Sequence, residues 1–321
     1  MPRPKSSPDP YLLGKVSALY YLRDHTQQEI AERLRLSRPT VSRLLREARD
    51  LGFVQITVTP PRGLHLDLET RLEDLFKLQT VRVAEGGDTA NNSKVLQQQL
   101  GAAAARHLAR TILPGETIGT AWGTTLTAMV DAMVPIPTEG SRVVQILGGL
   151  GAPDADEYGG VLARRLAQRL NAQVVLLPAP GVVATADVRD VLRKDPHVRA
   201  ALNELDSLDM IFVGLGSLAS NAVLNDGHTL TRQERKDLKV GRAACDIALR
   251  FFDAEGNSVR TTLDDRILGI TTGQLRKAAR VVAVAGGADK VEAIAAALKA
   301  GIVHVLITDR STAEALVARA E

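Results

Sequence analysis

The residues best suited to recognition chemistry lie between positions 26 and 46, where arginines and hydroxyl residues recur at helical spacing. Arg38, Thr40 and Arg43 fall on the polar side of a short helix whose other side is apolar. Arginine bonds guanine edges or phosphates and hydroxyls bond phosphates, so such a helix suits the major groove of DNA. The segment therefore predicts a helix-turn-helix that binds double-stranded DNA. The residues expected at the DNA surface are Thr26, Gln27, Ser37, Arg38, Pro39, Thr40, Ser42, Arg43 and Arg46.

The local sequence also predicts where the two helices of this motif begin. Thr26 with Glu29 three residues later is a capping-box pair, which satisfies two backbone amide donors at a helix start. Ser37 is placed to cap the second helix, and Pro39 lies in its first turn, where a missing N–H costs nothing. A basic helical hairpin at a protein surface is the alternative, but caps, turn length and polar stripe all favour the DNA-binding motif.

Charge is unevenly distributed along the chain. Residues 1–60 contain ten Lys and Arg against six Asp and Glu, a net charge of +4, whereas the whole chain carries +3 and the remainder therefore −1. The basic excess coincides with the predicted helix-turn-helix, where release of counterions would drive DNA binding.

The length of 321 residues predicts more than one domain. A helix over Tyr11–Asp24 should pack behind the DNA-reading pair, and the alternation in Phe53–Thr59 predicts a strand that forms a short wing. A linker, Pro60–Gly63, precedes Leu64–Leu78, whose leucines recur at spacings of three and four. That helix would either cover the second domain or pair with its counterpart in another subunit. The expected divisions are a DNA-binding domain (1–59), a linker and oligomerisation helix (60–79) and a ligand-binding domain (80–321).

From Thr80 onward, strand-like runs of Val, Ile and Leu alternate with amphipathic helices, which predicts an α/β domain with a mostly parallel sheet. In such sheets ligands bind at the carboxyl ends of the strands, beside helix N-termini. The expected strands are 80–83, 117–120, 142–146, 172–177, 210–213, 247–252, 259–262, 280–285 and 304–308. The expected helices are 91–112, 124–133, 156–170, 187–205, 289–299 and 311–319.

Glycine-rich loops follow several of these strands and could hold an anion. Gly123 permits a close turn, and the hydroxyls of Thr124 and Thr125 would cap the next helix, so its start would suit a phosphate. A capped turn without a ligand is the alternative. Lys290 follows a second glycine turn and would place a charge beside a phosphate, although a single lysine there is ordinarily just solvated. Gln145 offers a donor and an acceptor at a strand end.

Composition argues against several other kinds of site. Cys245 is the only cysteine and the six histidines are scattered, so no disulfide, metal site or cofactor is expected. Neither a Walker-type nor a dinucleotide-binding glycine motif is evident. No apolar run approaches the roughly 20 residues of a membrane span, and the N-terminus lacks the apolar core of a signal peptide. We expect a cytoplasmic protein without a membrane partner.

These motifs together resemble the SorC/DeoR-type family of sugar-responsive bacterial transcriptional regulators. The resemblance implies an effector domain with the fold of glucosamine-6-phosphate deaminase and ribose-5-phosphate isomerase. It also implies a sugar or sugar-phosphate effector and assembly into dimers and tetramers, with a homotetramer as the expected state. It rests on the helix-turn-helix (26–46) and, in order, on Trp122–Leu126, Gln145–Gly149, Leu177–Pro180, Asp209–Gly216, Ala244–Gly256, Ala285–Lys290 and Leu306–Asp309.

The resemblance also implies roles for individual residues. The effector's phosphate would be held by the Gly123–Thr125 loop and by Lys290, and Asp246 would meet sugar hydroxyls. Cys245 stands where relatives have glycine, a departure that bears on the local backbone and on the role of Asp246. The expected effector contacts are Gly123, Thr124, Thr125, Gln145, Gly148, Glu157, Asp246 and Lys290.

An isomerase- or deaminase-like enzyme with a DNA-binding appendage is the alternative function. Deaminase-like catalysis would need an Asp-Gly-His sequence directly after the turn Gly214–Gly216, whereas Asn225–His228 comes about ten residues later and fits a surface turn. For a Schiff base, no lysine lies between Lys94 and Lys194. We therefore expect a regulator without catalytic residues, acting as a repressor of a carbohydrate-metabolism operon.

Overall fold

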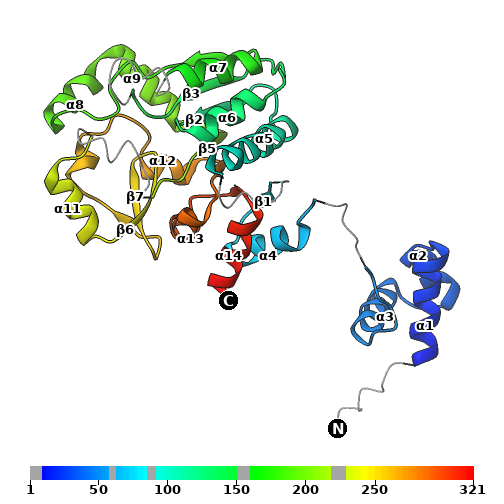
Figure 1. Ribbon diagram of the computed structural model, residues 1–321. Helices are drawn as coiled ribbons and strands as arrows, with labels where there is room; N and C mark the ends of the chain where they lie inside the picture. The colour runs from blue at the N-terminus through cyan, green and yellow to red at the C-terminus, as the bar shows by residue number, and fades with distance from the viewer. Residues whose placement is uncertain (1–8, 58–62, 85–91, 150–159, 218–228) are drawn as a thin grey trace, which may run out of the picture. The chain divides into compact units, whose positions relative to one another are not determined.

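The computed structural model describes residues 9–57, 63–84, 92–149, 160–217 and 229–321 (Figure 1). The chain divides into two compact units, Met1–Pro61 and Arg62–Glu321. The division falls within the Pro-Pro-Arg-Gly segment of the sequence.

The N-terminal unit is helical, and its helix starts agree with the predicted caps. It contains α1 (Pro10–Ser17), a π-helical turn η1 (Ala18–Leu22), α2 (Gln27–Leu34) and α3 (Arg38–Asp50). The Thr26 N–H donates to Glu29 Oε2 at 2.8 Å, and the Glu29 N–H donates back to Thr26 Oγ1 at 3.3 Å. The Thr40 N–H donates to Ser37 Oγ at 3.2 Å, with Pro39 in the first turn of α3. The helix-turn-helix prediction is confirmed.

The core of this unit is the predicted apolar face of the three helices. Its buried side chains are Leu13, Val16, Leu19, Ile30, Ala31, Val41, Leu44, Leu45 and Ala48. Burial of these residues orders α1 and α2 behind α3, since so short a helix is marginal in water without tertiary packing.

The expected wing does not form over the residues that the structure describes. Residues 53–57 adopt bends and irregular backbone instead of a strand, and residues 58–59 lie outside the described residues. Phe53 and Ile56 are 52% and 59% exposed. An isolated strand leaves its backbone groups without partners, and the described part of this unit offers no second strand to pair with.

The C-terminal unit is built on a seven-stranded parallel sheet in the order β1-β10-β9-β5-β2-β3-β4. The middle strand β5 is buried along its whole length, as expected for a sheet covered on both faces. The strands are β1 (Thr80–Val83), β2 (Thr117–Thr120), β3 (Arg142–Gln145), β4 (Gln173–Val175), β5 (Met210–Val213), β9 (Arg280–Val284) and β10 (Val305–Thr308). The mostly parallel α/β prediction is confirmed.

Helices cover both faces of this sheet. Connections that run from β1 towards β4 place α5, α6 and α7 side by side on one face, and the return connections place α13 on the other (Figure 1). The helices are α4 (Leu66–Phe76), α5 (Ser93–Thr111), α6 (Thr124–Ala132), α7 (Gly160–Leu170), α8 (Ala186–Lys194), α9 (Pro196–Asn203), α11 (Arg232–Val240), α12 (Thr272–Lys277), α13 (Val291–Lys299) and α14 (Arg310–Ala320).

Several boundaries differ from the sequence prediction, each for a local reason. The expected strand 247–252 is a hairpin of β6 (Ala243–Ile247) and β7 (Arg250–Asp253), which continues into a short strand β8 (Ser258–Val259). The expected helix 187–205 divides into α8 and α9 at Asp195–Pro196, because proline cannot continue a helix across its missing N–H. Helices α11 and α12 were not predicted.

Helix α4 closes the edge of the sheet at β1. Leu72 is fully buried, and the carboxylates of Glu73 and Glu69 accept the N–H groups of Val81 and Val83 at 2.8 and 2.9 Å. Glu69 also pairs with Arg82 at 3.2 Å. These glutamates accept hydrogen bonds from the outward N–H groups of an edge strand. Without acceptors, those N–H groups would be open to pairing with another chain. Of the two roles considered for this leucine-rich helix, contact with its own sheet is observed.

Replacing Glu69 by alanine should expose this edge and lower the free energy of unfolding by about 1–3 kcal/mol, since it leaves the Val83 N–H unsatisfied. Urea unfolding followed by the fluorescence of Trp122, the single tryptophan, provides the measurement. Asp74→Ala, an exposed position on the same helix, is the matched control and should change stability little. Equal stabilities for the two variants would contradict the role given to Glu69.

Candidate functional site

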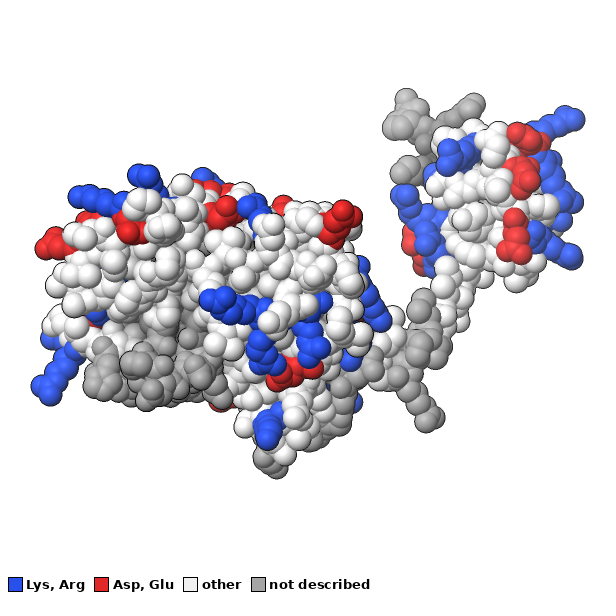
Figure 2. All heavy atoms as spheres, turned by 90° about the horizontal axis from the view of Figure 1, so that it is seen from above, with Lys and Arg blue, Asp and Glu red and all other residues white. Residues whose placement is uncertain are grey.

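The exposed face of α3 carries the side chains expected at DNA. Arg38, Arg43 and Arg46 are exposed, whereas Thr40 and Ser42 are half-buried. Figure 2 shows basic side chains projecting from this unit. The hydroxyls of Ser37 and Thr40 lie 2.8 Å apart and bond each other. These two hydroxyls therefore stabilise the start of α3, in addition to the DNA contact that the sequence predicts for them.

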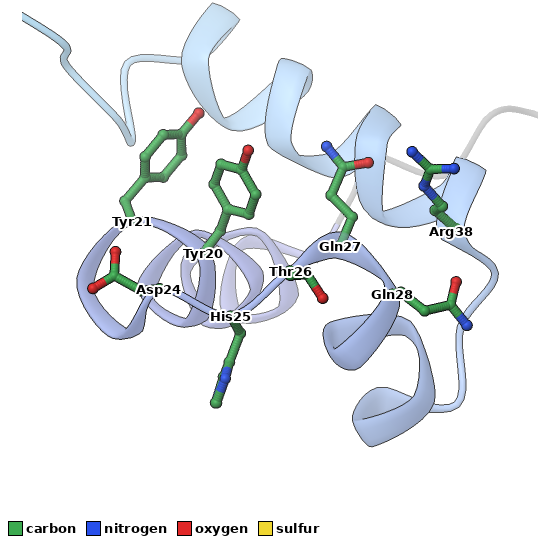
Figure 3. Close-up of a pocket in the computed structure, with 8 residues that line it drawn as sticks. All are labelled: Tyr20, Tyr21, Asp24, His25, Thr26, Gln27, Gln28 and Arg38. Atoms are coloured by element: carbon green, nitrogen blue, oxygen red, sulfur yellow. The ribbon is translucent and has the colours of Figure 1, made fainter.

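A pocket of about 790 Å³ lies in the N-terminal unit, where the start of α2 approaches Arg38 (Figure 3). Thr26, Gln27 and Arg38, which the sequence predicted at DNA, all line it. The other lining residues were not predicted from the sequence. The available signal was the adjacent pair Tyr20 and Tyr21, which precedes a capped helix. The remaining three are Asp24, His25 and Gln28.

The C-terminal unit contains a cavity of about 400 Å³ at the carboxyl ends of β2, β5 and β9. The neighbours β2 and β5 lead on in opposite directions, β2 towards β4 and β5 towards β10. Such a reversal opens a crevice above the strand ends, which is where open α/β sheets bind ligands. The loop after each of the three strands contributes to the wall, together with α5 and the β6–β7 turn.

Five of the eight predicted effector contacts line this single cavity: Gly123, Thr124, Thr125, Asp246 and Lys290. Gln145 and Gly148 are not among the residues that line it. The Gln145 side chain donates to Leu147 O at 2.7 Å and accepts the Leu177 N–H at 3.4 Å, so its amide is used by the backbone. A Cβ at Gly148 would lie 2.4 Å from Ala179 O, so this glycine serves close packing. Glu157 lies outside the described residues.

The start of α6 leaves backbone amides without a side-chain cap at the cavity. Its N-cap is Gly123, with φ 140°, and no side chain caps the helix. The expected capping by the hydroxyls of Thr124 and Thr125 is therefore wrong, because the helix begins at Thr124 itself and both residues lie inside its first turn. The first amides of a helix lack intrahelical acceptors and carry its positive dipole end. Here they belong to residues that line the cavity.

Asp309 holds the second glycine loop, Gly286–Lys290, in place through a hydrogen bond to its backbone. Asp309 Oδ2 accepts the Gly287 N–H at 2.9 Å and the Thr312 hydroxyl at 2.6 Å. Burial opposes ionisation of Asp309, but hydrogen bonds from Ser311, Thr312 and Gly287 outweigh it and hold its pKa below the usual value. A Cβ at Gly286 would lie 2.2 Å from this carboxylate. Asp309 thus fixes the turn that presents Lys290, a role that the sequence did not reveal.

The β6–β7 turn brings Asp246 to the cavity. The backbone of Asp246 exchanges two hydrogen bonds with Gly216, at 3.0 and 3.1 Å, and its Oδ2 accepts the Leu249 N–H at 3.3 Å. Ala248 and Leu249 are both left-handed, with φ 51° and 61°. Non-glycine residues in this region cost on the order of 1–3 kcal/mol each, and such strain clusters at functional sites. The turn is thus held in an unfavourable conformation at the wall of the cavity.

Cys245 does not disturb this arrangement. It lies in β6 opposite Phe252, is fully buried, and has none of the positive φ that would favour glycine. Desolvation on burial raises the pKa of its thiol, and the negative charge of the nearby Asp246 raises that pKa further. Cysteine therefore serves here as a small core residue.

The lining residues that were not predicted as effector contacts include one aromatic and two polar side chains. Trp122 is half-buried and presents an aromatic surface, and Ser93 and Gln97 contribute polar groups from the first turns of α5. The signal for the α5 pair was their spacing of four, which places both on one helical face.

Two features are absent from the residues that the structure describes. None of their helices is long and apolar enough to cross a membrane. Within the same residues, His, Cys, Asp and Glu side chains form no group suited to a metal ion.

A helix-turn-helix joined to an α/β unit with a cavity at its strand ends defines a ligand-responsive DNA-binding regulator. Comparison with known proteins supports that class. Residues 62–318 match the family described as "Putative sugar-binding domain", and residues 16–50 match "Sigma-70, region 4". The chain belongs to the SorC/DeoR-type family of sugar-responsive transcriptional regulators.

Individual relatives agree over nearly the full length. The chain is 33% identical over 305 residues to the deoxyribonucleoside regulator of Bacillus subtilis (strain 168), covering 94% of this chain and 96% of the relative. It is 31% identical over 315 residues to the sorbitol operon regulator of Klebsiella pneumoniae, covering 97% and 99%. The crystal structure of full-length SorC from that organism superimposes with a TM-score of 0.75 at 30% identity, covering 97% of this chain and 100% of SorC.

Asp309→Asn should loosen the Gly286–Gly287 turn and lower the free energy of unfolding at pH 7 by about 1–3 kcal/mol. Because the pKa of Asp309 is lowered in the folded state, its contribution is present above the ordinary aspartate value and is lost as the pH falls below about 4. Urea unfolding of both proteins between pH 7 and pH 3 checks this. A difference that grew on acidification would contradict the assignment.

Proposed function

We propose that this chain represses a carbohydrate-metabolism operon by binding operator DNA as a homo-oligomer, and that a phosphorylated sugar in the cavity controls that binding. The observation that carries the proposal is the convergence of the uncapped start of α6, Lys290 and Asp246 on one cavity. Two relatives are named for a deoxyribonucleoside and for sorbitol, which supports a small polyhydroxylated effector.

The phosphate of the effector would bind between α6 and Lys290. The amides of Thr124 and Thr125 offer donors at a positive dipole end, and Lys290 adds a full charge from the adjoining loop. Charge-assisted bonds are roughly twice as strong as neutral ones, so this end would contribute most of the affinity. The Gly287 amide takes no part, because Asp309 and Thr312 already accept it.

The hydroxyls of the sugar would meet the acidic side of the cavity. Asp246 and Asp289 both line it, and carboxylates accept hydroxyl protons. Trp122 offers an apolar surface for the C–H groups of a sugar ring. Gln145 would act at a distance by holding the Leu147 and Leu177 backbones.

We also infer that the site binds without catalysis. Its ionisable lining residues are Asp246, Asp289 and Lys290, with no histidine among the described lining residues to transfer a proton. Incubation with a panel of free and phosphorylated pentoses and hexoses, followed by product analysis, tests this, because turnover would favour the isomerase- or deaminase-like alternative.

The oligomer would be needed for tight DNA binding. One helix-turn-helix buries little surface, so two are normally held on a symmetric or repeated site. Leu66 and Leu75, which are 37% and 39% exposed on the outer side of α4, are proposed contacts between subunits. The effector can change DNA affinity only as far as it prefers one subunit arrangement over another. The protein would act in the cytoplasm, where the operator lies.

Arg43→Ala and Arg38→Ala should weaken binding to DNA. An arginine that bonds a base in two places is worth about 1–3 kcal/mol and its loss relaxes sequence specificity, whereas loss of a phosphate contact weakens all sequences alike. Operator DNA selected from a random library, followed by fluorescence anisotropy, distinguishes these outcomes. Wild-type affinity in both variants would refute DNA reading by α3.

Lys290→Ala and Thr124→Ala should weaken the effector, by about tenfold or more for the lost charge, and leave effector-free DNA binding unchanged. The effector is first found by thermal shift across the sugar panel, since a ligand at about 100 times its Kd stabilises by about 2.7 kcal/mol. Calorimetry then gives the affinities. Lys239→Ala, an exposed lysine outside the cavity, is the control. Equal affinities in all proteins would remove the proposed phosphate site.

A further inference from the structure

The pocket of the N-terminal unit has a composition that base reading by α3 does not explain. It lies where η1, the start of α2 and the start of α3 meet, and side chains of all three elements line it (Figure 3). Tyr20 and Tyr21 come from η1, Gln27 from the first residue of α2 and Arg38 from the first residue of α3. Side chains of three elements thus share one hollow.

The backbone beside this pocket is unusual. The helix over Tyr11–Asp24 that the sequence predicts ends at Ser17 as a regular helix and widens into a π-helical turn, after which Asp24 is left-handed with φ 54°. Single π turns are rare and occur frequently at functional sites. Here the turn places the rings of Tyr20 and Tyr21 edge to face, with centroids 4.9 Å apart. Both rings project to the same side as Gln27 (Figure 3).

Four polar groups of the pocket make no hydrogen bond within the part of the chain that the structure describes, whereas the Gln28 amide donates to Glu32 at 2.8 Å. The two tyrosine rings pack against the core of the unit. Among the described residues, no hydrogen bond engages either hydroxyl, the Gln27 amide or the Arg38 guanidinium. By contrast, His25 bonds Arg33 at 3.1 Å, which fixes it as part of the structure. The free groups are all capable of donating, and a phosphate accepts several such bonds at once.

We propose that this pocket holds a phosphate of the DNA backbone, with the hydroxyls of Tyr20 and Tyr21 donating to its oxygens beside Gln27 and Arg38. The inference rests on the proposed DNA binding by α3 and adds the contact that would fix the register of α3 on the duplex. The tyrosines are positioning residues, because contacts to phosphate carry no sequence information. Asp24 is the one carboxylate among the eight lining residues and opposes the bound charge.

The test uses the full chain and a fluorescein-labelled random-sequence duplex of roughly 30 bp, long enough for two half-sites. Tyr20→Phe and Tyr21→Phe keep the ring and remove only the hydroxyl. Each should weaken binding about fivefold, the value of one net hydrogen bond. The salt dependence should stay unchanged, because no cation is lost, whereas Arg38→Ala should lower the salt slope by about one.

Two variants serve as controls for this reading. Tyr11→Phe removes a hydroxyl from a side chain that is 74% exposed and outside the pocket, so its affinity should equal that of the wild type. Asp24→Asn removes the opposing charge and should strengthen binding. Thermal unfolding of each variant shows whether the fold is kept, and Tyr→Phe should leave it unchanged because the packed ring remains.

The outcomes separate this inference from the proposed function. If Arg43→Ala weakens duplex binding while Tyr20→Phe and Tyr21→Phe do not, the phosphate pocket is refuted and the regulator stands. If the wild type fails to bind the duplex at low salt, the proposed function itself fails. If the tyrosine variants lose affinity for inorganic phosphate but not for the duplex, the pocket serves a free anion and the inference is overturned.

Discussion

The cavity of the C-terminal unit depends on one topological constraint, the reversal of connection direction between the neighbouring strands β2 and β5. Parallel strands end at the same edge, and a reversal leaves their loops diverging above that edge. Close packing keeps the strands in register. At Gly119 of β2, for example, a Cβ would lie 2.7 Å from the Ile146 side chain. Residues separated by about half the chain can meet there only because the sheet holds their backbones in place.

Two buried carboxylates hold backbone groups at the edge of this sheet and in one of its loops. Glu69 accepts a backbone N–H of the edge strand β1, and Asp309 accepts one in the loop after β9. Asp309 directly follows β10, which pairs with both β1 and β9. A change in the Lys290 loop and a change in α4 therefore act on opposite sides of the same strand. Helix α14, which follows Asp309, also contacts both α4 and the Ala288–Lys290 turn.

Sequence patterns predicted what is local and repetitive. The capping pair Thr26–Glu29 and the buried strands could be predicted because each signal lies within a few residues. The hairpin at Ala248–Leu249 could not, because neither residue favours the left-handed backbone that tertiary contacts impose. The role of Asp309 could not be predicted, because the Gly287 amide that it accepts lies 22 positions away in the sequence. The pocket lined by Tyr20 and Tyr21 depends on a π turn, and no residue pattern in Ala18–Leu22 predicts such a turn.

The burial of Cys245 makes the protein convenient for thiol chemistry. Alkylating reagents attack the thiolate, and a sulfur that is both enclosed and held protonated offers them no target in the folded chain. A cysteine introduced at an exposed position would therefore be the only one to react, without first removing the native residue. One such site in each unit would carry a pair of spin or fluorescent labels, whose separation could be followed as sugar is added.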